Sequence, residues 1–144
     1  MSERVRLLLI AGTDEDALLL SRTLERSGFE VVSRRVDAMD AFEHALAHAE
    51  WDALVCDPDV LPASDVIGRL KGSGHDLPCI MVSDTPNLFP PLALIQAGAR
   101  DCLRRSELAR LAPVIESARQ ESAARFELQR VRDSLRESEA RYRA

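Results

Sequence analysis

Five short apolar runs, separated by segments with a different spacing of apolar residues, constrain the fold of this chain most strongly. The runs are continuous rather than alternating, as in parallel strands that are covered on both faces. They lie at residues 5–10, 29–32, 53–56, 78–82 and 102–103. Each run is too short for an ordinary helix, so all five are predicted to be strands.

The segments between the runs have apolar residues three and four positions apart, which predicts helices that bury one face. The first helix is expected to begin at Thr13 or Asp14 and to stop before Gly28, because hydroxyl and carboxylate groups cap helix starts and glycine favours helix ends. Others are expected around residues 41–49, 66–70 and 92–98. Strands that alternate with helices predict an α/β fold with a doubly wound parallel sheet, in which ligands bind beyond the carboxyl ends of the strands.

Composition narrows the class of protein. The chain has 144 residues, of which 46% are hydrophobic and 30% charged, which predicts a globular domain. A net charge of −5 with interspersed arginines argues against a nucleic-acid surface. The first apolar run is too short for a signal sequence or a membrane span, so a cytoplasmic protein without membrane contact is expected. Cys56, Cys79 and Cys102 lack the paired spacing of metal or disulfide sites and are expected to be free thiols.

The last part of the chain predicts one long helix. It starts near residue 112, with Pro113 in its first turn, and contains no glycine or later proline. Its apolar residues follow three-four spacing that is interrupted by Glu121, Arg125 and Ser138, which indicates a weak coiled-coil seam. They are Leu111, Val114, Ala118, Leu128, Val131, Leu135 and Tyr142. The alternative is a solvated helix held by local ion pairs. We therefore expect a first domain at residues 1–122 and a helical linker or coiled-coil-like extension at 123–144.

Several of these segments resemble the receiver domain of two-component response regulators, over about residues 4–122. The resemblance is carried by LLLI at 7–10, WDALVCD at 51–57, LPCIMVS at 77–83 and AGARD at 97–101. It implies a flavodoxin-like sheet of five strands in the order 2-1-3-4-5, followed here by an extended C-terminal helix. Residues 135–143 look like the helix that leads into a PAS domain, which implies the N-terminal part of a larger PAS-containing signalling protein.

The resemblance also assigns roles to particular residues. In such domains a phosphoryl group moves to an aspartate, assisted by a Mg²⁺ ion on an acidic pair, a hydroxyl group and a lysine. This chain keeps the phosphoacceptor position at Asp57 and the phosphate-contact positions at Ser83 and Arg105, where Arg105 replaces the lysine. The acidic pair is lost, because its positions hold Ala11 and Gly12, and the aromatic switch position holds Cys102.

The lost acidic pair implies weak Mg²⁺ binding at best, because a protein site for this ion usually supplies one or two carboxylates. If the missing ion forfeits roughly 4 kcal/mol, phosphotransfer slows about a thousandfold. We therefore expect no cofactor, no metal, no catalytic residue and no enzymatic activity. Weak Mg²⁺ binding is the alternative.

Three uses of the altered pocket stay open. Asp14, Asp59 and Asp84 could form a displaced cation site, Arg105 could pair permanently with Asp57, or a small ligand could fill the space beside Ala11 and Gly12. His44 and His48 share one helical face and are expected to be a surface pair rather than a metal site.

The sequence thus predicts a degenerate receiver-like domain, a pseudo-receiver, that acts through protein contacts. The expected partners are a second copy, through the C-terminal helix or the face of the fourth and fifth strands, and a histidine kinase or a downstream PAS or other output domain. The alternative is a functional receiver that a histidine kinase phosphorylates on Asp57.

Overall fold

The computed structural model describes residues 3–74, 76–84 and 91–143, and its centre is a parallel sheet of five strands in the order β2-β1-β3-β4-β5. The strands are β1 (Glu3–Ile10), β2 (Phe29–Val36), β3 (Ala53–Cys56), β4 (Cys79–Val82) and β5 (Asp101–Leu103). This confirms the α/β fold class and the flavodoxin-like strand order that the resemblance implied.

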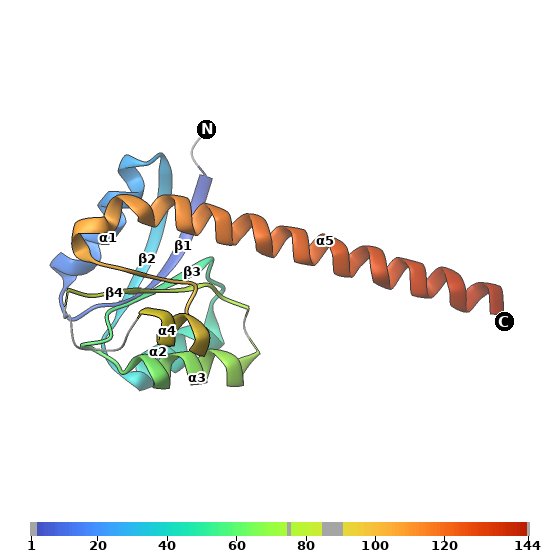
Figure 1. Ribbon diagram of the computed structural model, residues 1–144, viewed down its shortest axis with the longest axis horizontal. Helices are drawn as coiled ribbons and strands as arrows, with labels where there is room; N and C mark the ends of the chain where they lie inside the picture. Colours follow the sequence, from blue (N-terminus) through green and yellow to red (C-terminus); the bar gives the residue numbers. More distant parts are fainter. Residues whose placement is uncertain (1–2, 75, 85–90, 144) are drawn as a thin grey trace.

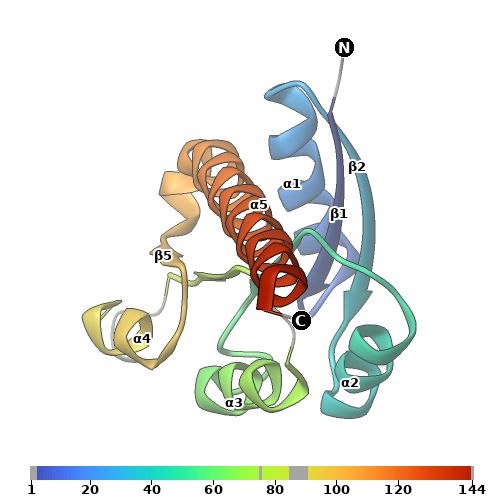
Figure 2. The same cartoon turned by 90° about the vertical axis from the view of Figure 1, so that its right-hand side faces the viewer.

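Helices cover both faces of the sheet. They are α1 (Asp14–Arg26), α2 (Met39–His48), α3 (Ala63–Ser73), α4 (Pro91–Ala97) and α5 (Leu111–Arg143), with a short 3-10 helix, η1 (Arg105–Arg110), before α5. α1 and α5 lie on one face, and α2, α3 and α4 lie on the other (Figure 2). Each face has its own apolar core, one between the sheet and α1, η1 and α5, and one between the sheet and α2 and α3.

The second strand is longer than its apolar run indicates. It was expected to end at residue 32, but β2 continues to Val36, which pairs with Ile10 of β1. The prediction was wrong because β2 is an edge strand, where one side has no neighbouring strand and polar side chains remain in contact with water. Ser33 and Arg34, in the unpredicted part, are exposed. By contrast, every residue of β3 and β4 is buried, so continuous apolar runs identified these central strands.

The ends of α1 form as their residues predict. The Thr13 hydroxyl accepts a hydrogen bond of 3.1 Å from the amide of Asp16, so Thr13 caps the helix and Asp14 is its first residue. Gly28 follows the helix with a φ of 98°, a conformation that side-chain-bearing residues rarely adopt. The cap places the first turn of α1 beside the carboxyl end of β1.

The last helix begins at Leu111, one residue before the predicted start, with Pro113 in its first turn. Leu111, Ala112, Ile115 and Ala118 are buried against the body. Beyond residue 122 every described side chain of α5 is exposed, and the helix extends well past the rest of the molecule (Figure 1). In the described part of the chain, no helix is long and apolar enough to cross a membrane.

Candidate functional site

Asp57 lies where parallel-sheet proteins bind ligands, directly after β3. Its amide donates a hydrogen bond of 2.9 Å to the carbonyl of Ile10 in β1. Its side-chain Oδ1 accepts a hydrogen bond of 2.9 Å from the amide of Asp59. The side chain is 18% exposed, so the carboxylate is held in a tight turn with limited access to water.

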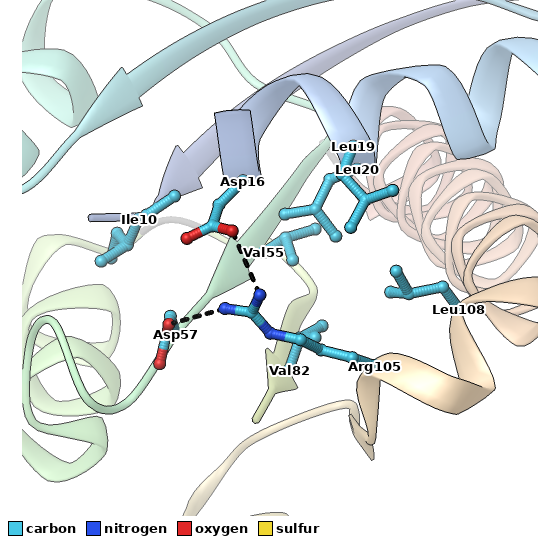
Figure 3. Close-up of a pocket in the computed structure, with 10 residues that line it drawn as sticks. Ile10, Asp16, Leu19, Leu20, Val55, Asp57, Val82, Arg105 and Leu108 are labelled. Atoms are coloured by element: carbon cyan, nitrogen blue, oxygen red, sulfur yellow. Dashed lines mark hydrogen bonds and ion pairs between the residues drawn. The ribbon is translucent and has the colours of Figure 1, made fainter. Parts of the chain in front are cut away.

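Arg105, the first residue of η1, brings one positive charge to this carboxylate. Its Nη2 lies 3.7 Å from Asp57 Oδ2, and its Nη1 donates a shorter hydrogen bond of 3.1 Å to Asp16 Oδ1. The Arg105 amide also donates to Asp84 Oδ1 at 3.0 Å. Figure 3 shows the guanidinium between Asp16 and Asp57. The predicted pair of Arg105 and Asp57 is therefore present, but as one part of a group of three carboxylates around one guanidinium.

Asp16 is the site residue that sequence reasoning missed. Its position in the first turn of α1 suggested only an interaction with the helix dipole. The signal that could have found it is topological, because the start of α1 and the end of β3 meet at the same edge of the sheet. Ala11 holds one of the two positions of the lost acidic pair, and it lines a small cavity beside Asp16, Asp57 and Arg105. A carboxylate thus reaches this pocket from α1 instead of from the end of β1.

The other two predicted positions lie nearby but have different surroundings. Ser83 directly follows β4, and its amide donates to the carbonyl of Leu103 at 3.1 Å. Cys102 is half-buried in β5 and packs against the core on the α2 and α3 face. The cavity opens on the other face, beside α1 and η1. Cys102 therefore lies across the sheet from the guanidinium group.

A small cavity lies beneath the charged groups. It measures about 20 Å³, which is space for about one water molecule. Three of its lining side chains are charged, those of Asp16, Asp57 and Arg105. The rest of the lining is apolar and consists of Ile10, Ala11, Leu19, Leu20, Val55, Val82 and Leu108. The interpretation that a small ligand fills the space beside Ala11 and Gly12 stays a prediction.

Burial and the nearby carboxylates of Asp59 and Asp16 shift the pKa of Asp57 in one direction, and the hydrogen bond from the Asp59 amide and the charge of Arg105 shift it in the other. Burial raises the pKa of Asp57 above its ordinary value, and the Asp59 amide and the Arg105 guanidinium offset only part of that effect. The pKa of Arg105 is also raised, chiefly by its hydrogen bond to Asp16. The guanidinium therefore stays charged, and the Asp57 carboxylate carries a charge that its surroundings do not fully stabilise.

The displaced cation site is not formed by the predicted residues. Asp14 is paired with Arg35 at 2.7 Å and its side chain is 91% exposed. Within residues 3–74, 76–84 and 91–143, no group of three or more potential metal-ligating side chains comes together. His44 and His48 stack with ring centroids 4.0 Å apart on the exposed face of α2, as a surface pair does.

All three cysteines are free thiols. Burial raises the pKa of Cys79 to about 12 and raises that of Cys56 further. Thiols of this kind stay protonated at neutral pH and behave as small apolar residues.

Comparison with known proteins gives one sequence match. No family model matches the chain. Over 99 residues the chain is 33% identical to the transcriptional regulatory protein PrrA of Mycobacterium leprae, a match that covers 67% of this chain and 42% of PrrA. The chain therefore spans about two-fifths of the length of this relative.

Solved structures share the fold at lower identity. NtrX from Brucella abortus has a TM-score of 0.76 at 19% identity, covering 92% of this chain and 29% of NtrX. Full-length FixJ from B. japonicum has a TM-score of 0.75 at 23% identity, covering 88% of this chain and 64% of FixJ. The signal receiver domain of a putative LuxO repressor from Vibrio parahaemolyticus has a TM-score of 0.68 at 18% identity, covering 84% of this chain and 97% of that domain.

The TM-scores show that this chain, with its strand order β2-β1-β3-β4-β5, shares the fold of these neighbours, one of which is a signal receiver domain. The match to PrrA adds sequence similarity over two-thirds of the chain. The shared fold and the sequence match together show that this chain carries a response-regulator receiver domain.

Proposed function

We propose that this receiver domain is a pseudo-receiver, which regulates through protein contacts and is not switched by phosphorylation of Asp57. The observation that carries the proposal is the guanidinium of Arg105, which lies between Asp57 and Asp16. At the positions of the acidic pair, Ala11 and Gly12 offer no carboxylate for a cation.

Charge balance explains why this arrangement disfavours phosphotransfer. A phosphoryl donor and an aspartate repel each other, and Mg²⁺ normally bridges them. A guanidinium can neutralise part of that charge, but it cannot bridge oxygens at the short distances of a metal ion. Arg105 already serves three carboxylates. The positive charge that remains for an incoming phosphoryl group is therefore small.

The wider role follows from the same proposal. The domain would keep one conformation that does not depend on phosphorylation, and it would form the N-terminal part of a longer PAS-containing signalling protein. It would need no cofactor and would not act as an enzyme. It would transmit its state by pairing with a second copy of the chain, either through α5 or through the face of β4 and β5. A histidine kinase is a partner only in the alternative, in which Asp57 accepts phosphate.

Intact-protein mass after incubation with acetyl phosphate and Mg²⁺ tests the proposal. We expect no adduct on the protein and none on its Asp57→Asn control. A single phosphate adduct that disappears in Asp57→Asn would overturn the pseudo-receiver proposal and establish the phosphoacceptor alternative.

A gain-of-function variant makes a negative result informative. Ala11→Asp, Gly12→Asp and Arg105→Lys together restore the acidic pair and the ammonium group. A Cβ added at Gly12 meets only the Val60 side chain at 3.5 Å, so a side chain fits there. We expect an Mg²⁺-dependent adduct on this variant. If it gained none while folded, the missing acidic pair would not explain the absence of phosphorylation.

A further inference from the structure

A stripe of apolar side chains lies uncovered on α5 beyond the body. Leu128, Val131 and Leu135 are 51%, 55% and 60% exposed. They are three and four residues apart, with Ala124 before them and Ser138 after them in the same spacing. We call residues 124, 128, 131, 135 and 138 the α5 stripe. Such spacing places side chains along one line of a helix, where a second helix can pack.

The α5 stripe points away from the body. An α-helix turns about 100° per residue, so the stripe is centred roughly 150° around α5 from the face formed by Leu111, Ile115 and Ala118. That face is buried against the sheet and α1. A helix packed on the stripe therefore has space beside it that the receiver body does not occupy.

Two ion pairs fix α5 to the body around the start of the stripe. Arg100, just before β5, donates to Glu121 Oε1 at 2.8 Å, and Arg125 donates to Asp76 at 2.8 Å. These contacts hold the direction of the helix as far as residue 125. The body thus presents the stripe in a fixed orientation, which lowers the entropy cost of pairing two such helices.

We propose that the α5 stripe is the interface for a second copy of this chain, in a parallel pair of helices aligned residue by residue. In this arrangement Leu128, Val131 and Leu135 each meet their own copy, so the apolar side chains cover one another. The proposal deepens the proposed function, on which it rests, because it assigns the protein contact of the pseudo-receiver to particular residues.

The charges beside the stripe favour the parallel orientation. Glu127 lies at one edge of the stripe and Arg132 at the other, five residues further along. In a parallel pair, the residue before one stripe position lies close to the residue five positions further along on the other helix. Glu127 of each copy therefore faces Arg132 of the second copy, which gives two such pairs of opposite charge. An antiparallel pair brings like edges together and places Arg132 opposite the second copy's Arg132 or Arg125. The antiparallel pair also places a leucine of the stripe opposite Ser138 or Ala124 of the second copy, so fewer large apolar side chains cover one another.

Sedimentation of the full chain tests whether the stripe pairs two copies. We expect a dimer that Leu128→Glu converts to a monomer. Phe126→Glu is the matched control, because Phe126 is 70% exposed but lies roughly opposite the stripe on the helix wheel, and it should leave the dimer intact. A monomeric wild-type chain, or equal effects of the two substitutions, would overturn the proposal.

Disulfide cross-linking tests the orientation. Leu128→Cys should cross-link to its own copy, and Asp133→Cys, roughly opposite the stripe, should not. Peptide mass distinguishes this bond from any made by the native cysteines. A dimer that does not cross-link at Leu128→Cys, but forms a bond when Leu128→Cys and Ser138→Cys chains are mixed, would be antiparallel and would overturn the parallel pairing.

Acetyl phosphate treatment of the cross-linked chain separates failure of the pairing from failure of the pseudo-receiver proposal. A phosphate adduct on a cross-linked dimer rejects only the phosphorylation-independent function. A monomer without adduct rejects only the α5 interface.

Discussion

At the scale of single residues, the unusual feature is a partly buried carboxylate that shares one guanidinium with two others. A carboxyl whose pKa is raised in the folded state favours folding only while it is protonated. Its contribution is complete below its ordinary pKa and is lost as the pH rises through the raised value. The direction of the Asp57 shift therefore means that this carboxylate costs stability at neutral pH.

Asp57→Asn is accordingly expected to stabilise the domain at pH 7, because it removes a charge that burial disfavours. The gain should shrink as the pH falls through the raised pKa of Asp57, and should be absent at about pH 3, below the ordinary pKa of an aspartate, where the carboxyl is protonated in the folded and the unfolded state. Urea denaturation at both pH values measures it. Asp14→Asn, at an exposed carboxylate paired with Arg35, is the control and should give no gain. A loss of stability in Asp57→Asn at pH 7 would show that the contact with Arg105 outweighs burial.

Sequence reasoning predicted part of this site and missed part of it for a clear physical reason. Asp57, Ser83 and Arg105 follow strands that the apolar runs predicted, and the resemblance to receiver domains assigned their roles. Asp16 reaches Arg105 from a separation of 89 residues. No local pattern reports such a contact, because it depends on how α1 and η1 pack on the sheet. The contacts of Arg105 with three carboxylates could not be predicted for the same reason, because they join residues far apart in the sequence.

At the scale of elements, the contact between α5 and the body beyond Ala118 depends on ion pairs rather than on apolar burial. After Ala118 no described residue of α5 is buried. The Arg100 guanidinium nevertheless donates to Glu121 and to Ser117. The helix start was predictable from Pro113, but these cross-element contacts were not. The extension of β2 was equally hidden, because an edge strand need not be apolar.

Arg100→Ala is expected to loosen α5 without unfolding the domain. The pair with Glu121 is partly exposed, so the free energy of unfolding should fall by less than about 1 kcal/mol. Amide hydrogen exchange should increase from about residue 119 onward, where the helix loses its anchor. Arg130→Ala removes a pair with Glu127 inside the same helix and should leave exchange near residue 119 unchanged. Equal exchange in both variants would mean that Arg100 does not hold the helix.

At the scale of the whole molecule, the receiver body and the end of α5 have separate tasks. Among the described residues, Ala118 is the last one that is buried, and the apolar cores contain nothing beyond Ile115, so the part of α5 that leaves the body contributes nothing to these cores. The uncovered stripe begins only at residue 124. A chain that ends at residue 122 should therefore keep its fold and lose its interface.

Removal of residues 123–144 is expected to change the free energy of unfolding by no more than about 0.5 kcal/mol, because every side chain that the structure describes there is exposed and the ion pair of Arg125 with Asp76 lies at the surface. The same truncation should convert a dimer to a monomer in sedimentation. If the truncated chain remained dimeric, the face of β4 and β5 would become the interface. If it lost its cooperative unfolding, the exposed end of α5 would be part of the folding unit, and the division of the chain near residue 122 would be wrong.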